Sequence, residues 1–380
     1  MRIPITPLIP GIISVLIVLL LPLTGIILNG NEISYYLQLP PAAGYTVHAP
    51  FSLPVFIVLT SAFLILISHP VFHIIRSRNT VTPVYRNNIK FPLWGWCGLI
   101  LCAAAWFIAW TRIPVFMPVQ RFTFLPLWLA YILIINALCL WRTGSSLITH
   151  STRYMAVLFP LSAIFWWIFE YLNRFTTNWY YTGSAELSVC RYIIEASLAF
   201  STVLPAVMST GELLKSFPKL YAGMDNYLKI NIKNSRSSAL ALLFIAGSGL
   251  AFTGIFPEIL FPLLWVSPLL ILTSITSLSG CGTVFSGIKN GDWRPVIIYS
   301  LSALICGFFW EMWNINCLAK WIYSIPYVNG LKIFEMPMPG YAGYLPFGLE
   351  CAVVAGFAGR LNKVQSADPN SIQSKRKKNS

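Results

Sequence analysis

Three acidic residues lie in a strongly apolar, aromatic-rich part of the sequence, residues 305–350. They are Glu311, Glu335 and Glu350. Placing a charged carboxylate inside a membrane costs at least ~2.5 kcal/mol on insertion scales, so such a residue is kept when it is paired, protonated or functional. Carboxyl groups that converge from two helices could hold one protonated and one ionised member, the arrangement used in general acid/base catalysis. The alternative is that they only join helices as polar contacts.

The residues around Glu311 could supply the other parts of a site. We expect Glu311 to be a proton donor, with Glu335 or Glu350 as its charge partner. Asn314 would orient the reacting groups. The candidate substrate-binding residues are Trp321, Tyr323, Lys320, Trp310 and Tyr341. Aromatic residues at a membrane interface are anchors by default, but here they could also wall a lipid pocket or stabilise a cation with their ring faces.

Most of this group of residues recurs earlier in the chain. Aligning residues 161–173 with 301–314 places Glu170 on Glu311 and Asn173 on Asn314, with a one-residue insertion. At offsets of about 137 to 142, Trp179, Tyr181, Glu195 and Pro205 match Trp321, Tyr323, Glu335 and Pro346, and Glu212 lies near Glu350. Because apolar runs align in any register, a shared offset for polar and aromatic residues indicates an internal repeat.

The composition indicates a membrane protein that crosses the bilayer many times. Hydrophobic residues make up 56% of the chain and charged residues 10%, whereas soluble domains have roughly 25% charged residues. Unbroken apolar runs of ~20 residues are typical of transmembrane helices and differ from the short alternating segments of a β-barrel. We expect about ten such helices, near residues 12–28, 53–75, 93–110, 123–141, 155–171, 190–211, 238–255, 258–277, 295–312 and 338–358.

The positions of the basic residues indicate which loops lie on the cytoplasmic side of the membrane. The net charge of +14 does not indicate nucleic-acid binding, because these residues lie in short clusters between apolar runs and in the tail Lys375–Lys378. Such clusters mark the cytoplasmic side. We therefore expect a multi-pass protein of a bacterial inner or cell membrane, with both termini in the cytoplasm and with Trp179 and Trp321 on the outer side.

The predicted fold class is an all-α polytopic membrane protein with two parallel four-helix repeats and two further helices before them. An even number of spans in each unit keeps both in the same orientation, so a pseudo-twofold axis is expected along the membrane normal. The expected segments are two N-terminal helices in 1–91, the repeats in 92–212 and 238–358, a basic cytoplasmic linker in 213–237, and a basic disordered tail in 359–380.

The sequence indicates neither a metal site nor a particular cofactor. The eight cysteines form no CxxC pair and mostly lie in apolar runs, which is typical of structural thiols. His69 and His73 share one helix face, but no acidic or cysteine partner follows nearby. We expect no metal site, and leave the cofactor unassigned.

The second copy resembles a family of carotenoid-modifying membrane enzymes, the heterodimeric-type lycopene cyclases and bacterioruberin-precursor hydratases. The resemblance covers about a third of the chain and rests on the order of Glu311, Trp321, Tyr323, Gly330, and Pro337 or Pro339. It implies a fold of repeated small helical units and acid catalysis on a double bond of a polyene. The adjacent acids that the cyclases carry after the proline do not occur here.

The leading functional hypothesis is an integral-membrane enzyme of cyclase, hydratase or isomerase type. Its partner would be a membrane lipid or another apolar small molecule, isoprenoid or carotenoid-like, and its mechanism acid/base catalysis by carboxyl groups. One alternative is a proton-coupled transporter or lipid-handling protein in which two parallel units close around a site. Another is a non-catalytic scaffold subunit. The first copy lacks the EMPMPGY segment, which favours a working site in the second unit.

Overall fold

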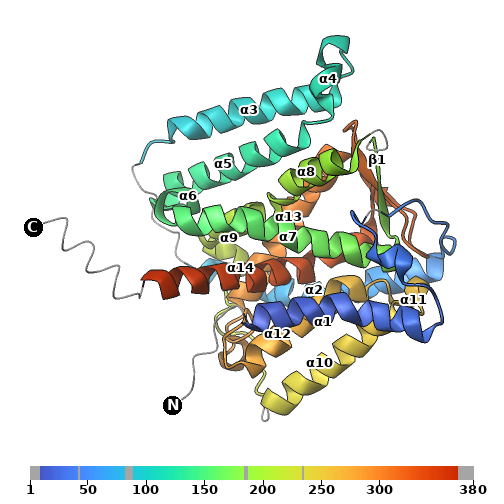
Figure 1. The fold of residues 1–380 in the computed structure, drawn as a ribbon. Coiled ribbons are helices and arrows are strands. Elements are labelled where there is room, and N and C mark those ends of the chain that lie inside the picture. The colour runs from blue at the N-terminus through green and yellow to red at the C-terminus, as the bar shows by residue number, and fades with distance from the viewer. Residues whose placement is uncertain (1–8, 42, 82–88, 184–186, 233–234, 367–380) are drawn as a thin grey trace, which may run out of the picture.

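The long helices of the protein run side by side between two ends of a bundle (Figure 1). The computed structural model describes residues 9–41, 43–81, 89–183, 187–232 and 235–366. The basic tail beyond residue 366, like Arg86 and Lys233, lies outside these residues. In Figure 1 the start of α1 and the end of α14 lie at one end of the bundle, and β1 lies at the other.

The long helices closely follow the apolar runs of the sequence. They are α1 (Ile9–Leu28), α2 (Leu53–Ser77), α3 (Leu93–Trp110), α5 (Phe124–Thr143), α7 (Thr152–Thr176), α8 (Val189–Phe200), α9 (Val203–Lys215), α10 (Ser235–Phe252), α12 (Leu263–Leu278), α13 (Arg294–Asn314) and α14 (Tyr344–Ser366). Within the described ranges, nine helical stretches are long and apolar enough to cross a membrane, with α8 and α9 counted as one. This confirms the prediction of an all-α, multi-pass membrane protein.

The tenth apolar helix, α12, is shorter than the expected run 258–277. It holds 16 residues, which at 1.5 Å each span about 24 Å, less than the ~30 Å of a hydrocarbon core. The single-turn helix α11 (Pro257–Leu260) precedes it. Pro262 lacks the amide hydrogen that would continue α11, so the chain turns between α11 and α12.

The helices pack in pairs that correspond in the two halves of the chain. In the first half α3 packs on α5, α5 on α9, and α7 on α9. In the second half α10 packs on α12, α12 on α14, and α13 on α14. The halves meet where α13 packs on α9 and α14 packs on α7.

The first two helices are attached differently. Helix α1 packs on α10 and α12, whereas α2 makes its main contacts with the short helices η6 (Met338–Gly343), η4 (Pro218–Tyr221) and η2 (Arg78–Thr80). Only Phe56 of α2 is buried. Helix α2 is therefore held mainly through its ends, and most of its side chains remain exposed.

The two ends of the bundle differ in their loops. At the end where α1 starts, basic loops contact one another: the Trp293 amide donates to the Met224 carbonyl at 2.7 Å, and the Tyr227 amide to the Gly291 carbonyl at 2.9 Å. At the other end, the Ala49 amide donates to Glu258 Oε2 at 3.0 Å. The end where α1 starts, called the basic end below, carries basic loops, although Arg121, Arg191 and Lys320 lie toward the other end.

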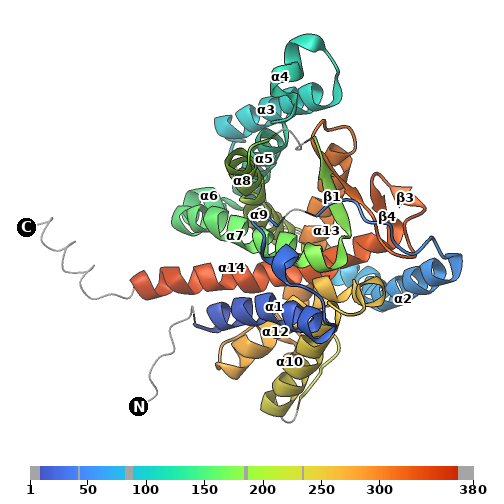
Figure 2. The ribbon, with the colours of Figure 1, turned by 45° about the vertical axis from the view of Figure 1, so that its right-hand side comes forward.

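In the part of the chain that the structure describes, four short strands lie at the end of the bundle opposite the start of α1 (Figure 2). Strand β1 (Trp179–Thr182) follows α7, strand β2 (Lys320–Tyr323) follows α13, and the two pair antiparallel. Strands β3 (Lys332–Ile333) and β4 (Met336–Pro337) form a small hairpin of their own. The β1–β2 pair joins segments that lie far apart in the sequence and forms part of the candidate site.

Candidate functional site

Glu170 lies near the end of α7, where three aromatic side chains hold its carboxyl group. Its Oε1 accepts hydrogen bonds from Trp166 Nε1 at 2.9 Å, Trp179 Nε1 at 3.2 Å and the Tyr181 hydroxyl at 2.6 Å. Its Oε2 is buried with no hydrogen-bond partner among the described residues. Arg174, one turn further on, donates instead to backbone carbonyls of the loop that follows α1. Glu170 is therefore held by neutral donors and not by a helix ion pair.

Glu311, near the end of α13, has a closely similar environment. Its Oε1 accepts hydrogen bonds from the hydroxyls of Tyr323 and Tyr344, both at 2.8 Å. Trp321 Nε1 donates to the Tyr323 hydroxyl at 3.1 Å. The Oε2 atom of Glu311 is also buried, and it has no hydrogen-bond partner in the part of the chain that the structure describes. No ion pair is found at either glutamate among those residues, so tyrosine and tryptophan are the groups that set their environment.

The two glutamates differ in which helix supplies one of their hydrogen-bond donors. At Glu170 it is Trp166, one turn earlier on the same helix. At Glu311 it is Tyr344 of α14, and the residue one turn before Glu311 is Gly307. A Cβ atom at Gly307 would lie 2.5 Å from the Tyr344 ring, closer than side chains can approach. The absence of a side chain at residue 307 therefore makes room for the ring that replaces the tryptophan.

The two asparagines hold the strands that carry the donors. Asn173 Nδ2 donates to the Trp179 carbonyl at 2.7 Å and its Oδ1 accepts from the Trp179 amide at 3.3 Å. Asn314 makes the same two bonds with Trp321, at 2.8 and 3.0 Å. We expected Asn314 to orient reacting groups, and the structure places it where it orients the backbone of β2.

Strands β1 and β2 form a two-stranded antiparallel ribbon. Side chains of this ribbon donate to the carboxyl groups of both Glu170 and Glu311. Trp179 lies opposite Tyr323, and Tyr181 lies opposite Trp321. Because side chains alternate along a strand, Tyr180 between them points to the other side, where its ring lies 5.6 Å from that of Tyr45. Both Trp–x–Tyr elements therefore present their tryptophan and tyrosine on the same side of the ribbon as the glutamates.

The tyrosines of the ribbon keep their protons. Burial raises the pKa of the Tyr181 and Tyr323 hydroxyls well above the ordinary value, and the neighbouring glutamates raise it further. Each hydroxyl therefore stays protonated near neutral pH and donates a hydrogen bond, and it is neither a ready-made phenolate base nor by itself a strong acid.

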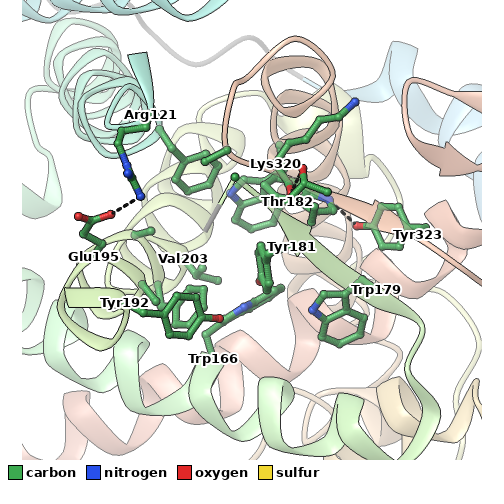
Figure 3. A pocket seen from close by; sticks show the side chains of 18 of the residues that line it. Arg121, Trp166, Trp179, Tyr181, Thr182, Tyr192, Glu195, Val203, Lys320 and Tyr323 are labelled. Atoms are coloured by element: carbon green, nitrogen blue, oxygen red, sulfur yellow. Dashed lines mark hydrogen bonds and ion pairs between the residues drawn. The ribbon is translucent and has the colours of Figure 1, made fainter. Parts of the chain in front are cut away.

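An aromatic cavity of about 180 Å³ lies against this ribbon (Figure 3). Its walls come from both halves of the chain and include Trp166, Trp179, Tyr181, Trp310, Trp321 and Tyr323. In Figure 3 the rings of Tyr181 and Trp166 face its middle, whereas the ammonium group of Lys320 points away. Glu170 and Glu311 are absent from the lining, so a bound molecule would touch the rings first and the carboxyl groups only through them.

Charged groups lie at the edge of this cavity. Two guanidinium groups share Glu195: Arg191 Nε lies 2.7 Å from Oε1, and Arg121 lies 3.7 Å from Oε2. Lys320 Nζ lies 2.5 Å from Glu335 Oε1. Glu335 therefore has a lysine as its ion-pair partner and makes no described hydrogen bond to Glu311.

The remaining predicted residues lie apart from the cavity. Glu350 is buried in α14, with Oε2 unpartnered and no hydrogen bond to Glu311 among the described residues. Glu212 pairs with Lys215 at 2.5 Å at the basic end of the bundle, so it does not correspond in place to Glu350. The Tyr341 hydroxyl donates to the Ile333 carbonyl at 3.1 Å.

Several residues of the site were not identified from the sequence. They are Trp166, Tyr344, Trp265 and Arg121. A signal existed for Trp166, because a residue four positions before Glu170 lies on the same helix face. For Tyr344 the clue was its place two residues before Pro346, where the first half of the chain has Val203 two residues before Pro205.

The composition of the site does not favour a metal centre. Among the described residues, no three His, Cys, Asp or Glu side chains are grouped so that they could hold a metal ion. The donors at the two glutamates are tyrosines and tryptophans, which place hydrogens, and not lone pairs, toward the carboxyl oxygens.

No protein-family model matches the chain, and no curated protein or solved structure is found to be similar to it.

Proposed function

We propose that this protein is an integral-membrane enzyme that moves a proton to or from an apolar lipid bound in the aromatic cavity. The observation that carries the proposal is the pair of hydroxyl–carboxyl contacts, Tyr181 with Glu170 and Tyr323 with Glu311, beside one aromatic cavity. Buried acids of this kind are costly in a membrane and are retained for a function or a pairing. Here neither carboxyl has a cationic partner among the described residues.

The chemistry follows from which group the lipid can reach. The glutamate must be protonated for this step: it passes its proton to the tyrosine oxygen while the tyrosine hydroxyl turns to the cavity and gives its own proton to one carbon of a carbon–carbon double bond, which leaves the glutamate as a carboxylate. The carbocation that forms lies among ring faces of tryptophan and tyrosine, which stabilise positive charge in a dry site. A neighbouring carbon then gives a proton back through the tyrosine to that carboxylate, which restores the protonated glutamate and completes an isomerisation or a cyclisation without a second reactant.

The substrate class in this proposal is an isoprenoid or carotenoid-like lipid. The lining is mostly aromatic and aliphatic, with its charged groups at the edge. A chain or ring of apolar carbons with double bonds suits such a cavity, because it leaves no polar group unsatisfied. The resemblance of the second copy to carotenoid-modifying enzymes makes these lipids the first class to test.

We further propose that the chain contains two parallel units related by a pseudo-twofold axis. Three features support this: the corresponding helix pairs of the two halves, the equivalent hydrogen bonds of Asn173 and Asn314, and the register of β1 with β2. A register that puts the tryptophan of each strand opposite the tyrosine of the other is what a twofold axis through the ribbon requires. The working site then belongs to both units, and not to the second alone.

The charge distribution supports an orientation for this arrangement. We place the basic end, with the start of α1 and the end of α14, in the cytoplasm, because cytoplasmic loops are enriched in lysine and arginine. The β1–β2 ribbon and the aromatic cavity then lie on the outer side of the membrane.

The ribbon also weighs against the transporter alternative. Alternating access needs the two units to move against each other around the site. Here main-chain hydrogen bonds of β1 and β2 tie the units together beside the cavity, so movement there would break a ladder. A fixed site for chemistry fits this connection better than a rocking one.

The test compares the lipids of cells that express the wild type, Tyr181→Phe, Tyr323→Phe and the double variant. Tyr180→Phe is the matched control, because its side chain lies on the other side of β1. Mass spectrometry of extracted lipids should show a product, or a depleted isoprenoid, in wild-type and control cells, and its loss in the double variant. An unchanged lipid profile in a folded double variant would refute the proposal.

A further inference from the structure

One edge of the aromatic cavity carries a guanidinium group that makes no hydrogen bond to the described part of the chain. Arg121 lies between the single-turn helix α4 (Met117–Gln120) and the start of α5, and it lines the cavity. Its one ion-pair partner among the described residues is Glu195, and the distance from Arg121 Nη2 to Glu195 Oε2 is 3.7 Å. This is longer than a hydrogen bond. Figure 3 shows the two side chains facing each other at the edge of the cavity.

The carboxylate of Glu195 already has a closer partner. Arg191 Nε donates to Glu195 Oε1 at 2.7 Å, within one turn of α8. Two guanidinium groups therefore share one carboxylate, and the contact of Arg121 is the weaker of the two.

The described charges at this edge do not balance. Arg121, Arg191 and Lys320 carry three positive charges, and Glu195 and Glu335 carry two negative charges, which leaves an excess of one positive charge. Lys320 does not supply this excess, because it pairs with Glu335 at 2.5 Å and its ammonium group points away from the cavity (Figure 3). The glutamates behind the rings enter the proposed reaction protonated and add no charge. The unbalanced charge is therefore that of Arg121.

The guanidinium group of Arg121 is partly shielded from solvent but still open to a ligand. Its side chain is 23% exposed. Of its three nitrogens only Nε is fully buried without a partner, so the two Nη atoms remain accessible. Withdrawing a charge from water without a partner is unfavourable, and the planar guanidinium presents its N–H groups in a fork that matches the oxygens of a phosphate or carboxylate. Arg121 is thus suited to an oxyanion from outside the chain.

We infer that the lipid bound in the aromatic cavity is an isoprenoid with an anionic, phosphate-type headgroup. The isoprenoid chain lies among the rings, and the headgroup lies at the edge of the cavity against Arg121. Helix α4 and β1 lie at the same end of the bundle (Figure 1), so in the proposed orientation the headgroup is near the outer surface of the membrane and keeps contact with water. The inference rests on the proposed function for the apolar part of the substrate and adds its headgroup.

The test measures binding of radiolabelled farnesyl phosphate and farnesol to the purified full-length protein in phosphatidylcholine nanodiscs, with binding to empty nanodiscs subtracted. The two probes share one isoprenoid chain and differ only in the phosphate. We expect the wild type to bind farnesyl phosphate at least about tenfold more tightly, the factor of one charge-assisted hydrogen bond. Inorganic phosphate should displace it only weakly, because it lacks the chain that fills the cavity.

Two variants should change the affinity for farnesyl phosphate in opposite directions. Arg121→Gln removes the unbalanced charge and should lower this affinity by at least about tenfold. Glu195→Gln removes the competing carboxylate and should raise it, a gain that misfolding cannot produce. Neither variant should change the affinity for farnesol. Lys229→Gln makes the same change of charge at an exposed residue of the basic end and should leave both affinities unchanged.

Ala196→Phe places a ring in the aromatic cavity and should abolish binding of both probes. Equal affinities of the wild type for the two probes, equal displacement by inorganic phosphate, no gain in Glu195→Gln, or binding that persists in Ala196→Phe would each overturn the inference. Its failure is distinct from failure of the proposed function. A preference for the phosphate without any conversion of lipid would refute the proposed function alone, and conversion of an isoprenoid without that preference would refute the headgroup site alone.

Discussion

The two tyrosine donors at Glu311 should contribute to stability in a strongly non-additive way. Tyr344→Phe removes one hydrogen bond, to Glu311, whereas Tyr323→Phe removes two, because the Tyr323 hydroxyl also accepts from Trp321. At about 1 kcal/mol for each hydrogen bond, the free energy of unfolding should fall by about 1 kcal/mol and about 2 kcal/mol, respectively.

The double variant should lose more than the sum of these values. With either tyrosine present, Oε1 of Glu311 keeps a hydroxyl donor. With both replaced by phenylalanine, the buried carboxyl group loses both of its hydroxyl donors. Its Oε2 already has no partner among the described residues. Leaving such a group unsatisfied adds about 1–3 kcal/mol, so the double variant should lose about 4–6 kcal/mol.

The measurement is equilibrium unfolding of the four proteins in one detergent, followed by tryptophan fluorescence, with Tyr180→Phe as the control that should change little. Strict additivity, with a double variant at about 3 kcal/mol, would refute the view that the two hydroxyls act on one shared carboxyl oxygen. A control that is as destabilised as Tyr323→Phe would show that loss of any tyrosine hydroxyl in the ribbon matters, and not the contact with Glu311.

Two further predictions concern packing and accessibility. Gly307→Ala should lower the melting temperature, because its Cβ would meet the Tyr344 ring at 2.5 Å and overpacking costs about 1–3 kcal/mol. Gly356→Ala is the control and should not lower it, because a Cβ there would have nothing within 4 Å. Equal melting temperatures of the two variants would contradict the prediction for Gly307. Burial raises the pKa of the Cys317 thiol to about 11, so the thiol stays protonated and unreactive at pH 7.5. Cys317 should therefore resist labelling by maleimide, while the exposed Cys190 reacts. Labelling of Cys317 in the folded protein would contradict this prediction.

The sequence predicted the helical class of the fold. Helical spans follow from apolar runs, because each span satisfies its own backbone within the membrane. The Trp–x–Tyr elements were expected to wall a pocket or to anchor the chain at the interface, and only the structure shows that their tyrosines donate to Glu170 and Glu311. The match of Asn173 with Asn314 extends to the same backbone hydrogen bonds.

The parts that involve both halves of the chain were not predictable in the same way. Nothing local in the sequence indicates that β1 pairs with β2, since the pairing depends on how α7 and α13 end beside each other. The partner of Glu335 was also missed, because Lys320 reaches it only after the loop between them folds back. Arg174 lies one turn after Glu170 but reaches the loop that follows α1 instead, and no spacing in the sequence reveals this contact.

The pairing of β1 with β2 has a consequence for how the protein is made. Ribosomes synthesise a membrane protein from its N-terminus, so α7 and β1 enter the membrane well before β2 and α14 exist. Until then Glu170 already has its own donors, but β1 has no partner strand and the cavity lacks the walls that the second half supplies. The site is therefore completed only once α14 has been made, and a truncated or stalled product holds a buried acid without a finished pocket.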